Sequence, residues 1–176
     1  TLPMNGLTAR LTLDRLGLEP GQTIAVTGAA GCYGGYVVQL AKADGLRVIA
    51  DASPSDEELV RSLGADVVVP RGDDIAASIR AVAPAGVDAV ADGSVQQGLV
   101  LGAVRDGGGV ACIRPFQGET ERGVILHPIW VHEYATAGDL LDRLGRQAEE
   151  GAITLRIART FAAEDAPEAH RTLERG

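Results

Sequence analysis

The sequence predicts an α/β fold in which an open, doubly wound parallel sheet lies between layers of helices. Short apolar runs alternate along the chain with segments whose apolar residues recur at helical spacing, as in right-handed strand–helix–strand units. Hydrophobic residues make up 45% of the chain but aromatic residues only 3%, so the core must be aliphatic, which suits a buried parallel sheet. The 176 residues suffice for one full core, and we expect a single domain over residues 1–176.

The first expected elements form a strand–turn–helix unit. Asn5 can cap a helix from about Gly6 to Gly17, and residues 20–21 then turn the chain into a strand at residues 24–26. A glycine-rich turn and a second helix follow, and this helix ends at Gly45.

The remaining elements continue the alternation. We expect strands at residues 47–50, 67–69, 87–91, 109–113 and, near one edge of the sheet, 124–126 with 129–131. Ser53, Pro54 and Asp56 have the order of a helix cap, a first-turn proline and a first-turn acid, which predicts a helix with a stop at Gly64. Further helices are indicated by three apolar sets: Ile75, Ile79 and Val82; Leu99, Val100 and Val104; Leu140, Leu141 and Leu144. A short strand at residues 155–159 and a helix at residues 164–175 complete the expected order.

Charge and composition restrict the partners of the chain. The formal net charge is −8 and the 16 Lys and Arg residues are spread singly, so no basic stripe exists that could follow a nucleic-acid backbone. The sequence has no run of 18 apolar residues, no basic-then-apolar leader and only two cysteines. We therefore expect a cytoplasmic protein that binds neither nucleic acid nor a membrane. Because the chain begins with Thr and opens almost directly on a helix, we also expect a fragment of a longer protein.

Three glycines follow the first expected strand at a spacing of three residues, in the order Gly28, Gly31 and Gly34. Such a turn lets the backbone approach a ligand, and it directs the unpaired N–H groups of the next helix toward an anion such as a pyrophosphate. Asp51 ends the next strand, 17 residues after Gly34, where a carboxylate can bind the ribose hydroxyls of a dinucleotide. The alternative is a glycine-rich turn that only packs a helix against the sheet.

Other catalytic motifs are missing from the sequence. It contains no G-x-S-x-G elbow and no G-x-x-x-x-G-K-[ST] loop, which argues against hydrolases and nucleoside triphosphatases. No Tyr-x-x-x-Lys pair exists, so a short-chain dehydrogenase would lack its base. Two further hypotheses stay open: a methyltransferase that binds S-adenosylmethionine above the same kind of turn, and a nucleotide-binding module without catalysis.

The cysteines and histidines show no zinc-binding spacing, so we expect no metal site within this chain. Cys32, at the head of a helix, could carry a lowered pKa, but a small residue that fills the turn is the simpler interpretation. His132, near Trp130 and Tyr134, could face a cleft, although we interpret it as an ordinary edge histidine.

Several segments with characteristic residues lie in a fixed order along the chain. They are LPMNGLTA (residues 2–9), GAAG-x-x-GG (residues 28–35) with VQLAK (residues 38–42), LGAD (residues 63–66) and AHRTLE (residues 169–174). In order and spacing they resemble the cofactor-binding half of the medium-chain dehydrogenase/reductase superfamily, which includes zinc-type alcohol dehydrogenases and quinone oxidoreductases. The resemblance implies a Rossmann-type domain that binds NADH or NADPH, with a barrel-like catalytic domain absent from this chain. It also implies hydride transfer between nicotinamide and a quinone, enone, or alcohol or carbonyl substrate.

The resemblance further implies where a dinucleotide would lie. The pyrophosphate would be surrounded by the glycine turn, with Gly28, Ala30, Gly31, Cys32, Tyr33 and Gly34. The adenosine ribose would lie beside Asp51, Ser53 and Arg71. The adenine or the nicotinamide would be flanked by Asp92 and Gly93 after one strand and by Ile113 and Arg114 after another. The nicotinamide end would lie near Asn5 and Thr8.

Two departures from the family pattern affect these expectations. Cys32 and Tyr33 replace a pair of small residues, so we expect a more crowded phosphate turn. Asp51 stands where many quinone-reductase relatives carry Thr, and a carboxylate binds a ribose 2′-hydroxyl but repels a 2′-phosphate, which favours NADH. Ser53, Ser55 and Arg71 could bind a 2′-phosphate if Asp51 turns away, so NADPH stays open.

The apolar residues 124–131 lie at one end of the expected sheet. An uncovered apolar edge invites a partner, and the resemblance implies that this domain forms dimers through such an edge. We therefore expect a homodimer.

Overall fold

The structure is a computed structural model that describes residues 2–134 and 136–175. Its strands are β1 (Thr23–Thr27), β2 (Arg47–Ala52), β3 (Val67–Pro70), β4 (Val87–Asp92), β5 (Val104–Cys112) and β6 (Ile125–Pro128). All neighbouring pairs are parallel, and they form one sheet in the order β3-β2-β1-β4-β5-β6. The predicted doubly wound parallel sheet is confirmed.

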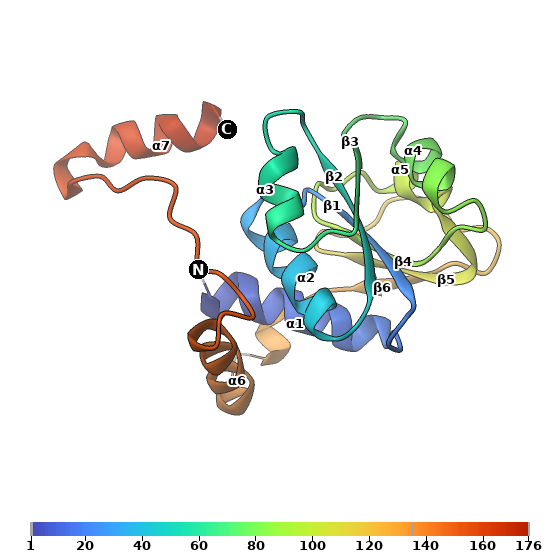
Figure 1. Ribbon diagram of the computed structural model, residues 1–176, viewed down its shortest axis with the longest axis horizontal. Coiled ribbons are helices and arrows are strands. Elements are labelled where there is room, and N and C mark those ends of the chain that lie inside the picture. The colour runs from blue at the N-terminus through green and yellow to red at the C-terminus, as the bar shows by residue number, and fades with distance from the viewer. Residues whose placement is uncertain (1, 135, 176) are drawn as a thin grey trace.

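Helices cover both faces of this sheet (Figure 1). The helices are α1 (Leu7–Leu16), α2 (Cys32–Ala43), α3 (Glu57–Ser62), α4 (Ile75–Val82), α5 (Gly98–Leu101), α6 (Gly138–Glu149) and α7 (Ala166–Arg175), the last of which lies away from the sheet. Within the described residues, no helix has both the length and the apolar character that a membrane crossing requires.

Successive residues of the central strands pack into opposite layers, because side chains alternate along a strand. Ile24 and Val26 of β1 belong to a buried cluster that also contains side chains of α1, α2, α3 and α6. Ala25, between them, belongs to the cluster that contains side chains of α4 and α5. Both layers are built mainly from aliphatic residues, as the composition predicts.

The N-terminal helical segment starts earlier than expected, and the prediction that Asn5 caps a helix is wrong. A π-helical turn, Leu2–Gly6, runs directly into α1, and Gly6 has helical angles of φ −66° and ψ −47°. Asn5 lies inside this continuous segment, so it is not at a free helix end that needs a cap.

The helix after β2 begins later than predicted. The hydroxyl of Ser53 donates to the carboxylate of Asp56 at 2.6 Å, and the N–H of Asp56 donates to the carbonyl of Ser53 at 3.0 Å. These bonds close a turn, so α3 begins only at Glu57.

The helix after β4 has a single turn, and the prediction that Val104 belongs to it is wrong. Val95 and Gln97 have positive φ angles of 58° and 51°, which an α-helix cannot contain, so α5 starts only at Gly98. Val104 instead begins β5, where it pairs with Val87.

The last two predicted strands also differ from the structure. β6 ends at Pro128, and Val131–Tyr134 form a 3-10 turn, so residues 129–131 add no second strand segment. Residues 155–159 form no strand either, since the segment that leads to α7 departs from the sheet and has no neighbouring strand for its backbone hydrogen bonds (Figure 1).

Candidate functional site

The candidate site lies at the carboxyl ends of the central strands. The chain builds the sheet from β1 outward through β2 and β3, and then returns to add β4, β5 and β6 on the other side of β1. Open α/β sheets bind ligands at such a reversal of strand order. Thr27 of β1 and Asp92 of β4 are partners across it.

The turn after β1 folds back on itself so closely that it requires glycine. Gly28 has a left-handed φ of 66°, and a Cβ there would lie 3.1 Å from the backbone of Gly93 and Ser94. A Cβ on Gly34 would lie 2.3 Å from the carbonyl oxygen of Gly28. The N–H of Gly31 donates to that same oxygen at 2.9 Å. The turn thus places an exposed glycine, Gly31, at the N-terminus of α2, where free N–H groups and the helix dipole favour an anion.

The side chain of Asp51 is fully buried near the end of β2, beside this turn. Its Oδ1 accepts a hydrogen bond from the N–H of Ala29 at 3.1 Å. Its Oδ2 has no hydrogen-bond partner among the described residues and lies 3.8 Å from Nε of Arg71. Burial raises the pKa of this carboxyl group, while the N–H of Ala29 and the Arg71 guanidinium act in the opposite direction. A buried carboxylate with an unused oxygen fits a ligand that supplies hydroxyl donors.

Asp92 is also buried, but groups of the protein itself occupy its carboxylate. Oδ1 accepts hydrogen bonds from the hydroxyl of Thr27 at 2.8 Å and from the N–H of Gln96 at 3.0 Å. Oδ2 accepts one from the N–H of Gln97 at 2.7 Å. Asp92 therefore closes the turn after β4 over the end of β1, and its direct contact with a cofactor stays a prediction.

One pocket lies on the β2–β3 side of the glycine turn. It has a volume of about 510 Å³ and is lined by residues at the carboxyl ends of β2 and β3. Ser53 and Arg71, both predicted to lie beside the adenosine ribose, share it with Glu57. Ser55, the third residue considered for a 2′-phosphate, is exposed and bonds to the hydroxyl of Ser53 at 2.9 Å.

A second pocket lies on the opposite side of the turn, beyond β5 and β6. It has a volume of about 410 Å³ and brings together five of the predicted residues, namely Asn5, Thr8, Tyr33, Ile113 and Arg114. Trp130 and His132 complete its wall, with their ring centroids 6.4 Å apart. His132, interpreted from the sequence as an ordinary edge residue, thus faces the pocket.

The expectation that Tyr33 crowds the phosphate turn is wrong. Its side chain is turned into the interior, where its hydroxyl lies 2.8 Å from the hydroxyl of Thr12 in α1. Burial raises the pKa of this phenol. Cys32 is exposed at the start of α2.

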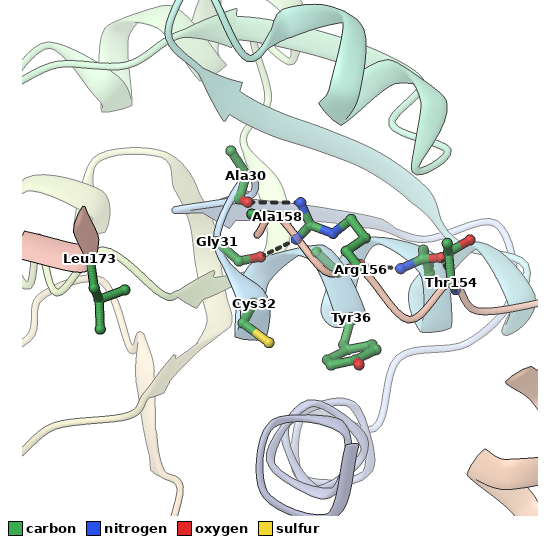
Figure 2. A pocket seen from close by; sticks show the side chains of 10 residues that line it. Ala30, Gly31, Cys32, Tyr36, Thr154, Arg156, Ala158 and Leu173 are labelled. Atoms are coloured by element: carbon green, nitrogen blue, oxygen red, sulfur yellow. Dashed lines mark hydrogen bonds between the residues drawn. The ribbon is translucent and has the colours of Figure 1, made fainter. Parts of the chain in front are cut away.

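Arg156, which was not predicted from the sequence, contacts the glycine turn from the segment after α6. Its Nη1 donates to the carbonyl of Ala30 at 3.1 Å, and its Nη2 donates to the carbonyl of Gly31 at 2.8 Å (Figure 2). A Cβ on Gly35 would lie 2.6 Å from Nη2, so this glycine leaves room for the guanidinium. The Gly34-Gly35 doublet was the only signal of this contact in the sequence.

The part of the chain that the structure describes contains no group of three or more His, Cys, Asp or Glu side chains that could hold a metal ion. Cys32 and Cys112, the two free cysteines, differ in setting, since one is exposed and the other buried. The described residues therefore do not fit a zinc site.

Comparison with known proteins identifies the family. A family model described as zinc-binding dehydrogenase matches residues 33–155. Alcohol dehydrogenase 1 of Emericella nidulans is 34% identical over 128 residues, which cover 69% of this chain and 33% of that relative.

Solved structures agree with this match. CurK enoyl reductase has a TM-score of 0.84 at 26% identity, over 99% of this chain and 57% of that one. The mycobacterial protein Rv1454c, solved in complex with NADPH, has a TM-score of 0.83 at 26% identity, over 97% of this chain and 58% of that one. The chain thus spans about a third of the curated relative and somewhat more than half of each structure. Because the family model matches well over half of the sequence, the chain belongs to the zinc-binding dehydrogenase family, within the medium-chain dehydrogenase/reductase superfamily.

Proposed function

We propose that this chain is the NAD(P)-binding domain of an oxidoreductase that transfers a hydride between nicotinamide and a quinone, an enone, or an alcohol or carbonyl substrate. The observation that carries the proposal is Oδ2 of buried Asp51, which accepts no hydrogen bond among the described residues and lies beside a turn that only glycine can form. The family match, the alcohol dehydrogenase relative and the NADPH complex of Rv1454c support it.

Each part of the site would hold one part of the dinucleotide. The N–H groups at the start of α2 would bind the pyrophosphate, and Asp51 would accept hydrogen bonds from the adenosine ribose. The pocket with Ser53 and Arg71 would take the adenosine end, and the pocket with Asn5 and Thr8 the nicotinamide end. Bound nicotinamide supplies the hydride chemistry, so the task of this chain is to position it.

We propose NADH as the preferred cofactor. A 2′-phosphate at the adenosine end would meet three carboxylates, those of Asp51, Asp56 and Glu57, and one cation, Arg71. Like charges at such short range cost affinity, whereas a free 2′-hydroxyl can donate to Asp51. Ser53 and Arg71 are the groups that would favour NADPH, the cofactor found in Rv1454c.

We also propose that the substrate-binding residues lie on a second, barrel-like domain outside this chain. The chain accounts for 33% of the alcohol dehydrogenase relative and 57% of CurK enoyl reductase, so both relatives are considerably longer. The pocket with Trp130 and His132 is the part of this chain expected to face that domain.

Isothermal titration calorimetry with NADH, NADPH and S-adenosylmethionine tests the proposal. We expect NADH to bind most tightly, NADPH more weakly, and S-adenosylmethionine not at all. Binding of NADPH alone would overturn the preference assigned to Asp51. Binding of S-adenosylmethionine without either nicotinamide cofactor would identify a methyltransferase instead.

A further inference from the structure

The segment after α6 is tied to the outside of the glycine turn and to α2. Ile153 is buried, and the N–H of Thr154 donates to the side-chain oxygen of Gln39 at 2.7 Å. The amide of Gln39 in turn donates to the carbonyl of Gly35 at 3.0 Å. Arg156 follows, with its two bonds to Ala30 and Gly31. The guanidinium thus reaches the turn from an anchored stretch of backbone (Figure 2).

The two bonds from Arg156 fix the orientation of two consecutive peptide planes. A trans peptide is planar, and its N–H points opposite to its carbonyl. Because Arg156 holds the carbonyl of Ala30, the N–H of Gly31 in the same peptide plane points away from the guanidinium. This N–H donates to the carbonyl oxygen of Gly28 at 2.9 Å. Because Arg156 holds the carbonyl of Gly31, the N–H of Cys32 points outward from the first turn of α2. That N–H is one of the free donors at the anion site.

The charge of Arg156 is not neutralised locally. Over the described ranges, 2–134 and 136–175, no carboxylate lies within ion-pair distance of its guanidinium, and its recorded partners are two neutral carbonyls. The cation lies in the wall of an open pocket that it shares with Gly31 and Cys32. A positive charge there adds to the field of the helix N-terminus.

We propose that Arg156 is a positioning residue for the diphosphate of the cofactor. It acts through the carbonyls of Ala30 and Gly31, which hold the turn in the conformation that directs the N–H of Cys32 outward, and its charge favours the anion. The inference rests on the proposed function, because it assigns a residue to the diphosphate part of that same site.

Ligands with and without a diphosphate separate this role from a structural one. We expect Arg156→Ala to weaken NADH binding by about three- to tenfold, the worth of one or two hydrogen bonds, and adenosine binding by less than about twofold. Arg156→Lys, which keeps the charge and one donor group, should recover more than half of the loss in binding free energy. Arg159→Ala is the matched control, since Arg159 lies on the same segment but stacks 4.7 Å from the ring of Phe161. An equal loss for NADH and adenosine, or an equal loss in the Arg159 variant, would overturn the proposal.

Gly35 provides an independent test that keeps the arginine in place. Gly35→Ala puts a methyl group within 2.6 Å of Nη2 and displaces the guanidinium. It should weaken NADH binding in the wild-type background and have no further effect in Arg156→Ala. Additive losses in the double variant would show that the two residues act separately, contrary to the proposal.

Hydrogen exchange without cofactor distinguishes a failure of this inference from a failure of the proposed function. In Arg156→Ala, the N–H groups of Gly31 and Gly35 should exchange faster, because both donate to carbonyls within the turn that Arg156 holds. Faster exchange in a protein that binds no nicotinamide cofactor would retain the positioning role and reject the cofactor. Unchanged exchange would reject the positioning role, whatever the cofactor.

Discussion

Asp51 shows how a single residue can oppose folding and favour binding. Its carboxylate is buried, with one oxygen bonded to the N–H of Ala29, while the other lies 3.8 Å from Arg71 and accepts no hydrogen bond in the described part of the chain. An unpaired acceptor in the interior costs free energy until a donor reaches it. A ribose hydroxyl would supply that donor, which explains why an unfavourable residue suits this position.

Asp51→Asn should separate these two effects. The amide oxygen can still accept from Ala29, but the charged acceptor for the ribose is lost, so NADH should bind about tenfold more weakly or worse. NADPH binding should change less, because the repulsion of its 2′-phosphate is removed at the same time. Calorimetry with both cofactors measures the change, and an unaltered affinity for NADH would contradict the role of Asp51.

The same substitution should change the dependence of stability on pH. Burial raises the pKa of Asp51, so the folded chain holds this proton more tightly than the unfolded chain does. The contribution of Asp51 to stability therefore falls as the pH rises from about 4, the unfolded pKa, through the higher folded pKa. Relative to wild type, Asp51→Asn should gain stability over that interval and keep the gain at neutral pH. Urea unfolding between pH 4 and 8 tests this prediction. A gain in stability that shrinks with rising pH would mean that folding lowers the pKa of Asp51 instead of raising it.

Asp92 is expected to behave differently, because both of its carboxylate oxygens already accept hydrogen bonds from the protein. Asp92→Ala would leave the hydroxyl of Thr27 and two backbone N–H groups without their acceptor, at a cost of about 3 kcal/mol or more in unfolding free energy. Asp92→Asn keeps one acceptor oxygen and should lose less. Urea denaturation at neutral pH provides the measurement, and a cost below about 1 kcal/mol for the Ala variant would be inconsistent with these bonds.

At the scale of elements, the junction between β1 and α2 depends on the close approach of two glycines. Gly34→Ala would place a Cβ 2.3 Å from the carbonyl oxygen of Gly28, so the backbone must shift, at a cost of about 1–3 kcal/mol. Gly145→Ala is the control, because Gly145 lies within α6 with no atom within 4 Å of its added Cβ, and it should stabilise by about 0.5–1 kcal/mol. Thermal unfolding of the two variants should shift in opposite directions, and two equal shifts would contradict the packing argument.

The strands were predictable from the sequence because burial on both faces leaves continuous apolar runs, as at residues 24–26 and 87–91. The ends of the helices were less predictable from the sequence. The hydroxyl of Ser53 bonds to Asp56 instead of capping a helix, and the positive φ angles at Val95 and Gln97 shorten α5. Local propensity does not reveal which partner a polar side chain chooses, or where a buried carboxylate such as Asp92 draws the backbone into an irregular turn.

The candidate site was predictable to a similar extent. Gly28 and Gly34 lie in the turn and first helical turn after β1 and Asp51 lies near the end of β2, as the sequence predicted, because strand, turn and helix are local in sequence. Their contacts with a cofactor stay predictions. Arg156 was missed because it contacts Gly31 across 125 residues of sequence, from a segment that was predicted to be a short strand. Contacts of this kind depend on how the chain returns to the turn after the sheet is complete.

At the scale of the whole molecule, the two edges of the sheet differ. β3, at one edge, ends at Pro70, and its carboxyl end lies beside the charged side chains of Arg71 and Glu57. β6, at the other, exposes Ile125, and Trp130 is exposed just beyond its end. Prolines and charges protect a sheet edge from pairing, whereas exposed apolar residues invite it. We propose that a second copy of the chain pairs with β6, which would make one continuous sheet through the dimer.

Ile125→Lys should disrupt this dimer, because a lysine at the edge places two like charges in the paired interface. Ile125 is 54% exposed in the single chain, so the substitution leaves the core untouched and the fold intact. Leu99→Lys is the matched control, since Leu99 is 45% exposed on α5 and not on a strand of the sheet. Light scattering at micromolar concentration should give twice the monomer mass for wild type and for Leu99→Lys, and the monomer mass for Ile125→Lys. A monomeric wild type would contradict the proposed pairing, and a dimeric Ile125 variant would place the interface elsewhere.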